Sequence, residues 1–313
     1  MAADPRPKPF RDILRDNNHF LVPPLQWNSR HLDLVGCRFE DVATLDCTKS
    51  TENRDGGHSQ GRSAKQPNDV GDLAMHLSPI IKRQRLINIL AGEEGRFASP
   101  RSIDHVHDSS PPVVGYVHYT DVNGARDRQF RPCPGPKGFV NYVGWEICKK
   151  RVAQTTPKEW TEDPYFLCHL LALAQLQERK LKPSDPVTYK SRLLVTNALD
   201  KKHILFYEAQ ITTELLDALR DPKTATMPME WPAIRRKKIP YKPYDTFADR
   251  LVAELVAPCP LSSGNSPPSV SPSTSTDNVN HVSEHGQKRL HEQEDSGSYK
   301  GNYLYVEDLM EHF

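Results

Sequence analysis

The feature that most constrains this chain is a nearly apolar, helix-forming stretch at residues 163–180, which reads D-P-Y-F-L-C-H-L-L-A-L-A-Q-L-Q-E-R-K. An Asp-Pro pair suits a helix start, because the carboxylate accepts hydrogen bonds from first-turn amides and Pro lacks an N–H that would be unpaired there. Between residues 165 and 176 only His169 and Gln175 are polar. A helix that is apolar on all sides must be buried on several of them. This one is shorter than the roughly 20 apolar residues that span a bilayer, so we predict the central helix of a globular domain.

Runs of β-branched and aromatic residues on both sides of this helix are typical of strands. Four such runs occur, at residues 113–119, 139–145, 189–196 and 203–210. The dipeptide Asn123-Gly124 predicts a turn between the first two, because N-G is a strong hairpin signal. Capped, amphipathic stretches predict further helices, at residues 79–91, 213–219 and 244–256. We expect an α+β (mixed α/β) fold, with the central buried helix against a small mixed sheet.

Composition divides the chain into five parts. A hydrophobic content of 37% and 27 Pro in 313 residues suggest one core-bearing domain with unstructured segments. We predict a partly ordered N-terminal segment at 1–47, a polar, flexible linker at 48–71 and the globular domain at 72–257. A disordered, low-complexity Ser/Pro-rich tail follows at 258–297. The last part, 298–313, ends in the acidic, aromatic peptide Y-L-Y-V-E-D-L-M-E-H-F, which docks on this domain, docks on a partner, or frays.

Charge and cysteine usage exclude several classes of protein. The 41 basic and 40 acidic residues give a net charge of +1, which offers no global reason for a nucleic-acid or membrane partner. The six Cys form no C-x-x-C pair, so a structural zinc site is not expected. Nucleotide-cradling glycine motifs and the G-x-S-x-G nucleophile elbow do not occur, and we expect no cofactor. The first residues lack the apolar core of a signal peptide, which favours an intracellular location, cytoplasmic or nuclear.

Three polar clusters are candidate binding or metal sites. The run Arg235-Arg236-Lys237-Lys238 is compatible with a nuclear-import signal or a nucleic-acid contact, but we favour a charged approach to an edge strand. The cluster Lys82, Arg83 and Arg85 is more typical of a solvated helix face than of a phosphate site. The stretch His105-Val106-His107-Asp108 looks like part of a metal site, but the partner acid or His is missing beside it, and a polar loop is favoured.

The predicted order of helices and strands resembles the core of the PD-(D/E)xK nuclease superfamily. That resemblance implies a metal-dependent nuclease in which Asp121 and Glu146 bind Mg²⁺, with Lys149 and Gln175 as the lysine and helix glutamine. The chain departs from the pattern, because Glu146 and Lys149 are three residues apart and would face opposite sides of a strand. A degenerate fold without the chemistry, or plain solvated surface charges, are the competing interpretations.

Three further stretches carry a second resemblance: G-W-E-I-C-K-K-R-V-A-Q at 144–154, D-P-Y-F-L-C-H-L-L-A-L-A-Q-L-Q at 163–177 and I-P-Y-K-P-Y-D-T-F at 239–247. Together they resemble a group of hypothetical proteins of filamentous fungi, over about residues 110–257. This resemblance implies no activity and no site residues. We therefore expect a non-enzymatic intracellular interaction or regulatory module with a protein partner, and the metal-dependent nuclease built on Asp121 and Glu146 is the alternative.

Overall fold

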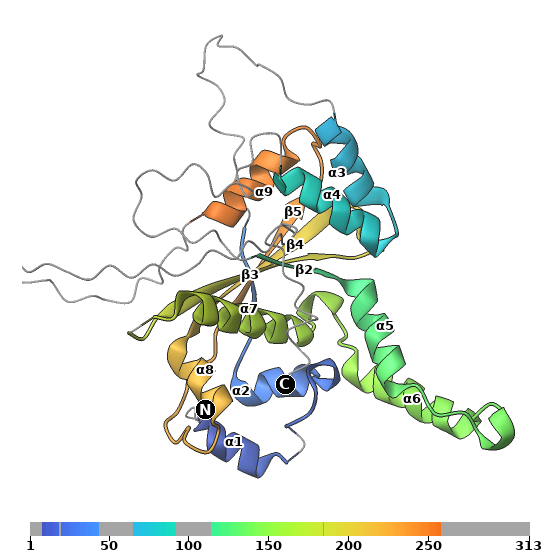
Figure 1. Ribbon diagram of the computed structural model, residues 1–313, viewed down its shortest axis with the longest axis vertical. Coiled ribbons are helices and arrows are strands. Elements are labelled where there is room, and N and C mark those ends of the chain that lie inside the picture. The colour runs from blue at the N-terminus through green and yellow to red at the C-terminus, as the bar shows by residue number, and fades with distance from the viewer. Residues whose placement is uncertain (1–7, 19, 44–64, 92–113, 184, 258–313) are drawn as a thin grey trace, which may run out of the picture. The chain divides into compact units, whose positions relative to one another are not determined.

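The computed structural model describes residues 8–18, 20–43, 65–91, 114–183 and 185–257. A five-stranded mixed sheet with the strand order β1-β5-β4-β3-β2 lies at its centre (Figure 1). Its strands are β1 (Phe39–Asp41), β2 (Val114–His118), β3 (Thr188–Thr196), β4 (His203–Thr212) and β5 (Ile234–Pro240). Strand β4 runs antiparallel to its neighbours β3 and β5, whereas β2 runs parallel to β3 and β1 runs parallel to β5. The strands predicted at 113–119, 189–196 and 203–210 are confirmed.

Helices cover both faces of this sheet, so the fold is α+β in three layers. One hydrophobic cluster joins a face of the sheet to α1 (Phe10–Asp16), α2 (Ser29–Val35), α7 (Tyr165–Leu181) and α8 (Thr213–Arg220). A second cluster joins the other face to α3 (Lys65–Met75), α4 (Pro79–Ala91) and α9 (Phe247–Val256). Short 3-10 helices lie at Pro24–Gln26 (η1), Pro136–Gly138 (η3) and Trp160–Glu162 (η4).

Helix α7 is the predicted central helix, and its burial is confirmed. Eleven of its residues are buried, and Phe166, Leu167 and Leu170 have no exposed surface. The Asp163 carboxylate accepts a hydrogen bond from the backbone N–H of Tyr165 at 2.9 Å, as expected of a residue at a helix start. The helix packs along β3 and fixes one face of the sheet.

Two helices replace the hairpin predicted after β2. Helix α5 (Tyr119–Phe130) runs through the N-G dipeptide, and α6 (Tyr142–Thr155) occupies most of the strand predicted at 139–145. The turn prediction was wrong because tertiary contacts of the buried Arg126 side chain hold α5 against the body. The strand prediction was wrong because Asn141 starts a helix, accepting a hydrogen bond at its Oδ1 from the Gly144 backbone N–H at 2.8 Å.

The N-terminal segment belongs to the same core. Strand β1 pairs with β5, and the aromatic rings of Phe10, Phe20 and Trp27 pack together, with the Trp231 ring tilted against that of Phe10 at 5.6 Å between centroids. Residues 65–71, predicted as the end of a linker, lie in α3. Strand β5 is an inner strand, so the prediction of an edge strand at this position was wrong. The N-terminal segment supplies the strand that covers it.

Candidate functional site

Arg126 and Asp163 form an ion pair at which neither side chain has any exposed surface. The guanidinium donates two hydrogen bonds to the carboxylate, at 2.6 and 2.7 Å, and its Nε donates to the Leu25 carbonyl at 3.2 Å. The Tyr119 hydroxyl donates to the same carboxylate at 3.1 Å. Bidentate pairs of this kind fix geometry as well as charge. The pair joins α5, η1 and the start of α7, and it leaves no group free for chemistry.

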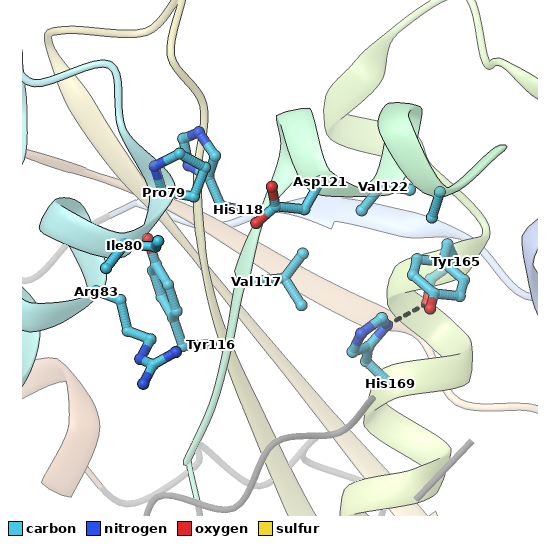
Figure 2. A pocket seen from close by; sticks show the side chains of 11 residues that line it. Pro79, Ile80, Arg83, Tyr116, Val117, His118, Asp121, Val122, Tyr165 and His169 are labelled. Atoms are coloured by element: carbon cyan, nitrogen blue, oxygen red, sulfur yellow. Dashed lines mark hydrogen bonds between the residues drawn. The ribbon is translucent and has the colours of Figure 1, made fainter. Parts of the chain in front are cut away.

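A pocket of about 150 Å³ lies beside β2, the last strand of the described sheet, where α4, α5 and α7 approach it (Figure 2). It is lined by residues from these four elements: Pro79, Ile80, Arg83, Tyr116, Val117, His118, Asp121, Val122, Ala125, Tyr165 and His169. A cavity of that volume holds about one benzene molecule, whereas ligand sites usually measure roughly 300–1,000 Å³. The pocket therefore accommodates only a very small ligand or a single side chain.

His118 is the most polar buried group in the pocket wall, at 3% exposure. Its Nδ1 lies 2.8 Å from the Thr196 hydroxyl oxygen, which is also 2.8 Å from the Tyr116 hydroxyl oxygen. Its Nε2 is buried and has no hydrogen-bond partner within the described part of the chain. Burial, with a smaller contribution from Lys82, lowers the pKa of His118 to about 4. The imidazole is therefore neutral at pH 7.

His169, on α7, is held in a similar neutral state. Its Nδ1 lies 2.9 Å from the Tyr165 carbonyl oxygen, the contact drawn as a dashed line in Figure 2. A carbonyl oxygen only accepts, so Nδ1 carries the proton. Burial lowers the pKa of His169 to about 4. The ring also packs edge-on against the Tyr165 ring, at 4.3 Å between centroids. Both pocket histidines are therefore neutral at pH 7.

The prediction that the basic cluster on α4 forms a solvated helix face was wrong, because Lys82 is fully buried. Its ammonium donates hydrogen bonds to the carbonyl oxygens of Leu73 and Ala74, at 2.6 and 3.3 Å. These carbonyls end α3, where the helix dipole favours a cation. Burial lowers the pKa of Lys82 to about 8. Arg85 pairs with an α3 carboxylate, from Asp69, at 2.8 Å. Two of the three cluster residues therefore join α4 to α3, while Arg83 lines the pocket.

The run Arg235-Arg236-Lys237-Lys238 forms most of β5, where its side chains alternate between the two faces of the sheet. Arg236 is 7% exposed and pairs with Asp41 of β1 at 2.7 Å. Lys237 pairs on the opposite face with the buried Glu254 of α9. Carboxylates of the same chain thus neutralise these two charges, which weakens the case for a nucleic-acid contact here.

The residues of the predicted nuclease site are distributed over three helices. Asp121 lies in the first turn of α5 and lines the pocket, and Gln175 lies on α7. Glu146 and Lys149 lie on α6, pair with each other at 2.8 Å and are 64% and 69% exposed. The argument from strand alternation does not apply to a helix. Glu146 and Lys149 are solvated surface charges, as the competing interpretation held.

Metal and thiol chemistry find little support in the described residues. Across them, no group of three or more His, Cys, Asp or Glu side chains is arranged to hold a metal ion. The stretch His105–Asp108 and the peptide at 298–313 lie outside the described residues. Burial raises the pKa of the Cys37 thiol to about 12, and it also raises the pKa of the Cys168 thiol. Such thiols are inert at neutral pH.

Helices α5 and α6 run together away from the sheet and form an arm, residues 119–155 (Figure 1). Six large hydrophobic side chains of this arm are exposed, and we refer to them as the arm patch. They are Phe139 (72%), Val140 (57%), Tyr142 (75%), Val143 (73%), Trp145 (40%) and Ile147 (49%). Sequence reasoning placed these residues in a strand. The signal it missed was Asn141, a helix-capping residue in the middle of the run.

Comparison with known proteins gave no relatives: no family model, no curated protein and no solved structure matches the chain. The resemblances to fungal proteins and to the nuclease superfamily therefore stay predictions. No helix within the described ranges is long and apolar enough to cross a membrane.

Proposed function

We propose that this chain is a non-enzymatic protein-interaction module and that the arm patch is its docking surface. The observation that carries the proposal is the concentration of exposed hydrophobic side chains in one short segment of the chain. Of the fifteen large hydrophobic residues exposed in the described part of the chain, six fall within residues 139–147. Exposed hydrophobic residues scattered singly are normal, whereas clusters are typical of interaction sites.

The small number of buried residues in α6 also supports this proposal. Only Cys148 and Thr155 of its fourteen residues are buried. Helices of roughly this length are marginal in water and owe most of their stability to tertiary packing. A partner that covers the arm patch would supply the missing contact for α6 and remove the hydrophobic side chains from water.

The charge around the arm patch indicates the chemistry of that partner. The arm exposes more bases than acids: Arg128, Arg131, Lys137, Lys149, Lys150 and Arg151 against Asp121, Asp127 and Glu146. A basic rim around a hydrophobic centre attracts an acidic surface and accelerates its encounter. The partner we propose is therefore a protein segment that presents hydrophobic side chains flanked by acids.

The test compares two charge-introducing variants of the full-length chain. Val143→Asp places a carboxylate in the arm patch, at the second residue of α6, where an acid is compatible with the helix dipole. Leu199→Asp, on the turn after β3, is the matched control, because Leu199 is 90% exposed. A partner identified by cross-linking should bind the purified control as tightly as the wild-type chain and bind Val143→Asp at least about tenfold more weakly. Equal binding by all three proteins would reject the proposal.

The metal-dependent nuclease stays a prediction with less support. Asp121 lies where α5 leaves β2, whereas Glu146 lies in the N-terminal half of α6, after the connection between the two helices. Calorimetric titration of the full-length protein with Mn²⁺ tests it directly. Binding that Asp121→Asn and Glu146→Gln each abolish would establish a metal site and argue against a purely non-enzymatic module.

A further inference from the structure

We propose that the arm patch binds an acidic amphipathic helix and that the chain carries one such ligand itself, the C-terminal peptide Tyr303–Phe313. This inference rests on the proposed function, because it identifies the occupant of the surface proposed above. It adds a regulatory consequence, since a ligand on the same chain competes with any external partner for the arm patch.

The peptide sequence has the spacing that such a ligand needs. Its residues Val306, Leu309, Met310 and Phe313 follow the spacing i, i+3, i+4, i+7. That spacing places four hydrophobic side chains on one face of a helix. The acids in the same stretch fall on the opposite side of that helix: they are Glu307, Asp308 and Glu311. The peptide contains no Lys or Arg, so its charge is opposite to that of the rim of the arm patch.

The arm patch offers the matching half of this contact. Hydrophobic side chains of Phe139, Tyr142 and Val143 are each more than 70% exposed. The cations Lys150 and Arg151 follow on the same helix, where they can face the acids of a bound peptide. Helix recognition by a hydrophobic surface with i, i+3, i+4, i+7 anchors is a recurrent mode of peptide binding.

A second copy of the arm is a poorer occupant than the peptide. A contact between two arm patches would place the same basic rim on both sides of the interface. Like charges across an interface disfavour association. The C-terminal peptide avoids that repulsion and replaces it with attraction.

The length of the connection between domain and peptide favours docking on the same chain. Residues 258–302 separate the end of the described fold from the peptide. A chain of about 45 residues with random-coil statistics has a root-mean-square span of roughly 35–40 Å. A tethered ligand of this kind has an effective concentration of up to the millimolar range. Weak binding by the isolated peptide is therefore sufficient for occupancy within the full chain.

Photo-cross-linking of the full-length protein tests the inference. The photoreactive residue p-benzoylphenylalanine replaces Tyr142 in one sample and Leu199 in the control, and cross-linked peptides are identified by mass spectrometry. We expect cross-links from position 142 to residues 303–313, and none from position 199. The double substitution Leu309→Asp, Met310→Asp should reduce them at least about tenfold. An unchanged circular-dichroism spectrum and thermal midpoint of this variant exclude a folding defect as the cause.

Mixing isotope-labelled and unlabelled protein separates the possible occupants. Cross-links within one chain, to the C-terminal peptide, support the inference. Cross-links between copies, or to any other segment, overturn it, as does a yield that the double substitution leaves unchanged. The proposed function is tested separately by the effect of Val143→Asp on a purified partner. Loss of partner binding without any cross-link to the peptide would leave that function standing while rejecting this inference.

Discussion

The body and the arm of this molecule treat their side chains in opposite ways. In the body, basic residues that resemble functional groups are largely withdrawn from water and paired with carboxylates: Arg126 with Asp163, Arg236 with Asp41, and Lys237 with Glu254. On the arm, hydrophobic residues that would normally be buried stay in contact with water.

This difference separates residues that hold the fold from residues that remain for a partner. A buried charge that already has its counter-ion is not available to bind a ligand, because breaking the pair leaves an uncompensated charge in a low-dielectric interior. An exposed hydrophobic cluster, in contrast, is available for binding, since covering it with an apolar surface lowers the free energy. The arm is therefore where function is to be sought.

The largest predicted effect lies in the body. Asp163→Asn removes the counter-ion of Arg126 and leaves a fully buried guanidinium with a neutral partner. We expect the free energy of unfolding, measured by urea denaturation at pH 7, to fall by about 3–5 kcal/mol. The control Asp185→Asn, at an exposed position, should change it by less than about 0.5 kcal/mol. A similarly small change for Asp163→Asn would show that the pair does not support the core.

The second prediction concerns acid stability. In the folded chain, burial lowers the pKa of His118 and His169 from 6.5 to about 4. The unfolded chain therefore binds more protons between these values, and stability falls as pH falls from about 6.5 to 4. Each histidine contributes roughly 3 kcal/mol to that loss, at about 1.4 kcal/mol per pKa unit.

The variant His169→Gln removes one of these two titrations. Its unfolding free energy, followed from pH 7 to pH 4, should lose less than that of the wild-type chain. The exposed His76, changed to Gln, is the control and should leave the pH dependence unaltered. A pH profile that His169→Gln leaves identical to the wild type would mean that the pKa of His169 is the same in the folded and the unfolded chain.

A smaller effect is expected where α4 meets α3. Lys82→Met keeps much of the side-chain volume but removes the ammonium that binds the Leu73 and Ala74 carbonyls. The unpaired carbonyls should cost about 1–3 kcal/mol, and hydrogen exchange should accelerate in the last turn of α3. Arg85→Met serves as the comparison. If Lys82→Met leaves hydrogen exchange in the last turn of α3 unchanged, Lys82 does not cap that helix.

The smallest stability effect is predicted for the arm. Val143→Asp and Tyr142→Ser alter exposed side chains that support no described part of the core, so unfolding free energy should change by no more than about 0.5 kcal/mol. The same variants should lose partner binding. A loss of stability comparable to that of Asp163→Asn would show that the arm patch stabilises the fold, and would contradict the proposed difference between body and arm.

Sequence reasoning succeeded where one local pattern settles the structure. The apolar stretch of α7, the alternating strands β3 and β4, and the stripe of Phe247, Leu251 and Leu255 in α9 all follow from periodicity. They form the centre of the fold, where burial depends on hydrophobic pattern more than on partners distant in the sequence.

It failed where distant residues decide the outcome. The helix through Asn123-Gly124 depends on Arg126 meeting a carboxylate 37 residues away. The inner position of β5 depends on β1, whose pairing partner lies 195 residues along the chain. Local sequence propensity cannot reveal contacts between residues so far apart in the chain. It therefore predicted an edge strand and a hairpin.

The candidate site was hidden for a related reason. Hydrophobic residues at 139–147 predict burial, and nothing in the sequence states that the fold leaves them uncovered. The basic residues attracted attention by their density, yet Lys82 and Arg236 proved to be parts of the core. Exposure is a property of the assembled fold, which is why the structure was needed to locate the arm patch.

The most direct test of the central claim is photo-cross-linking in the cells that naturally make this chain. The full-length protein would carry p-benzoylphenylalanine in place of Tyr142 or, as the control, in place of Leu199; both positions are exposed. The account predicts a discrete adduct from position 142, either to the C-terminal peptide or to an acidic partner, and none from position 199. No adduct at position 142, or the same adducts from both positions, would contradict it.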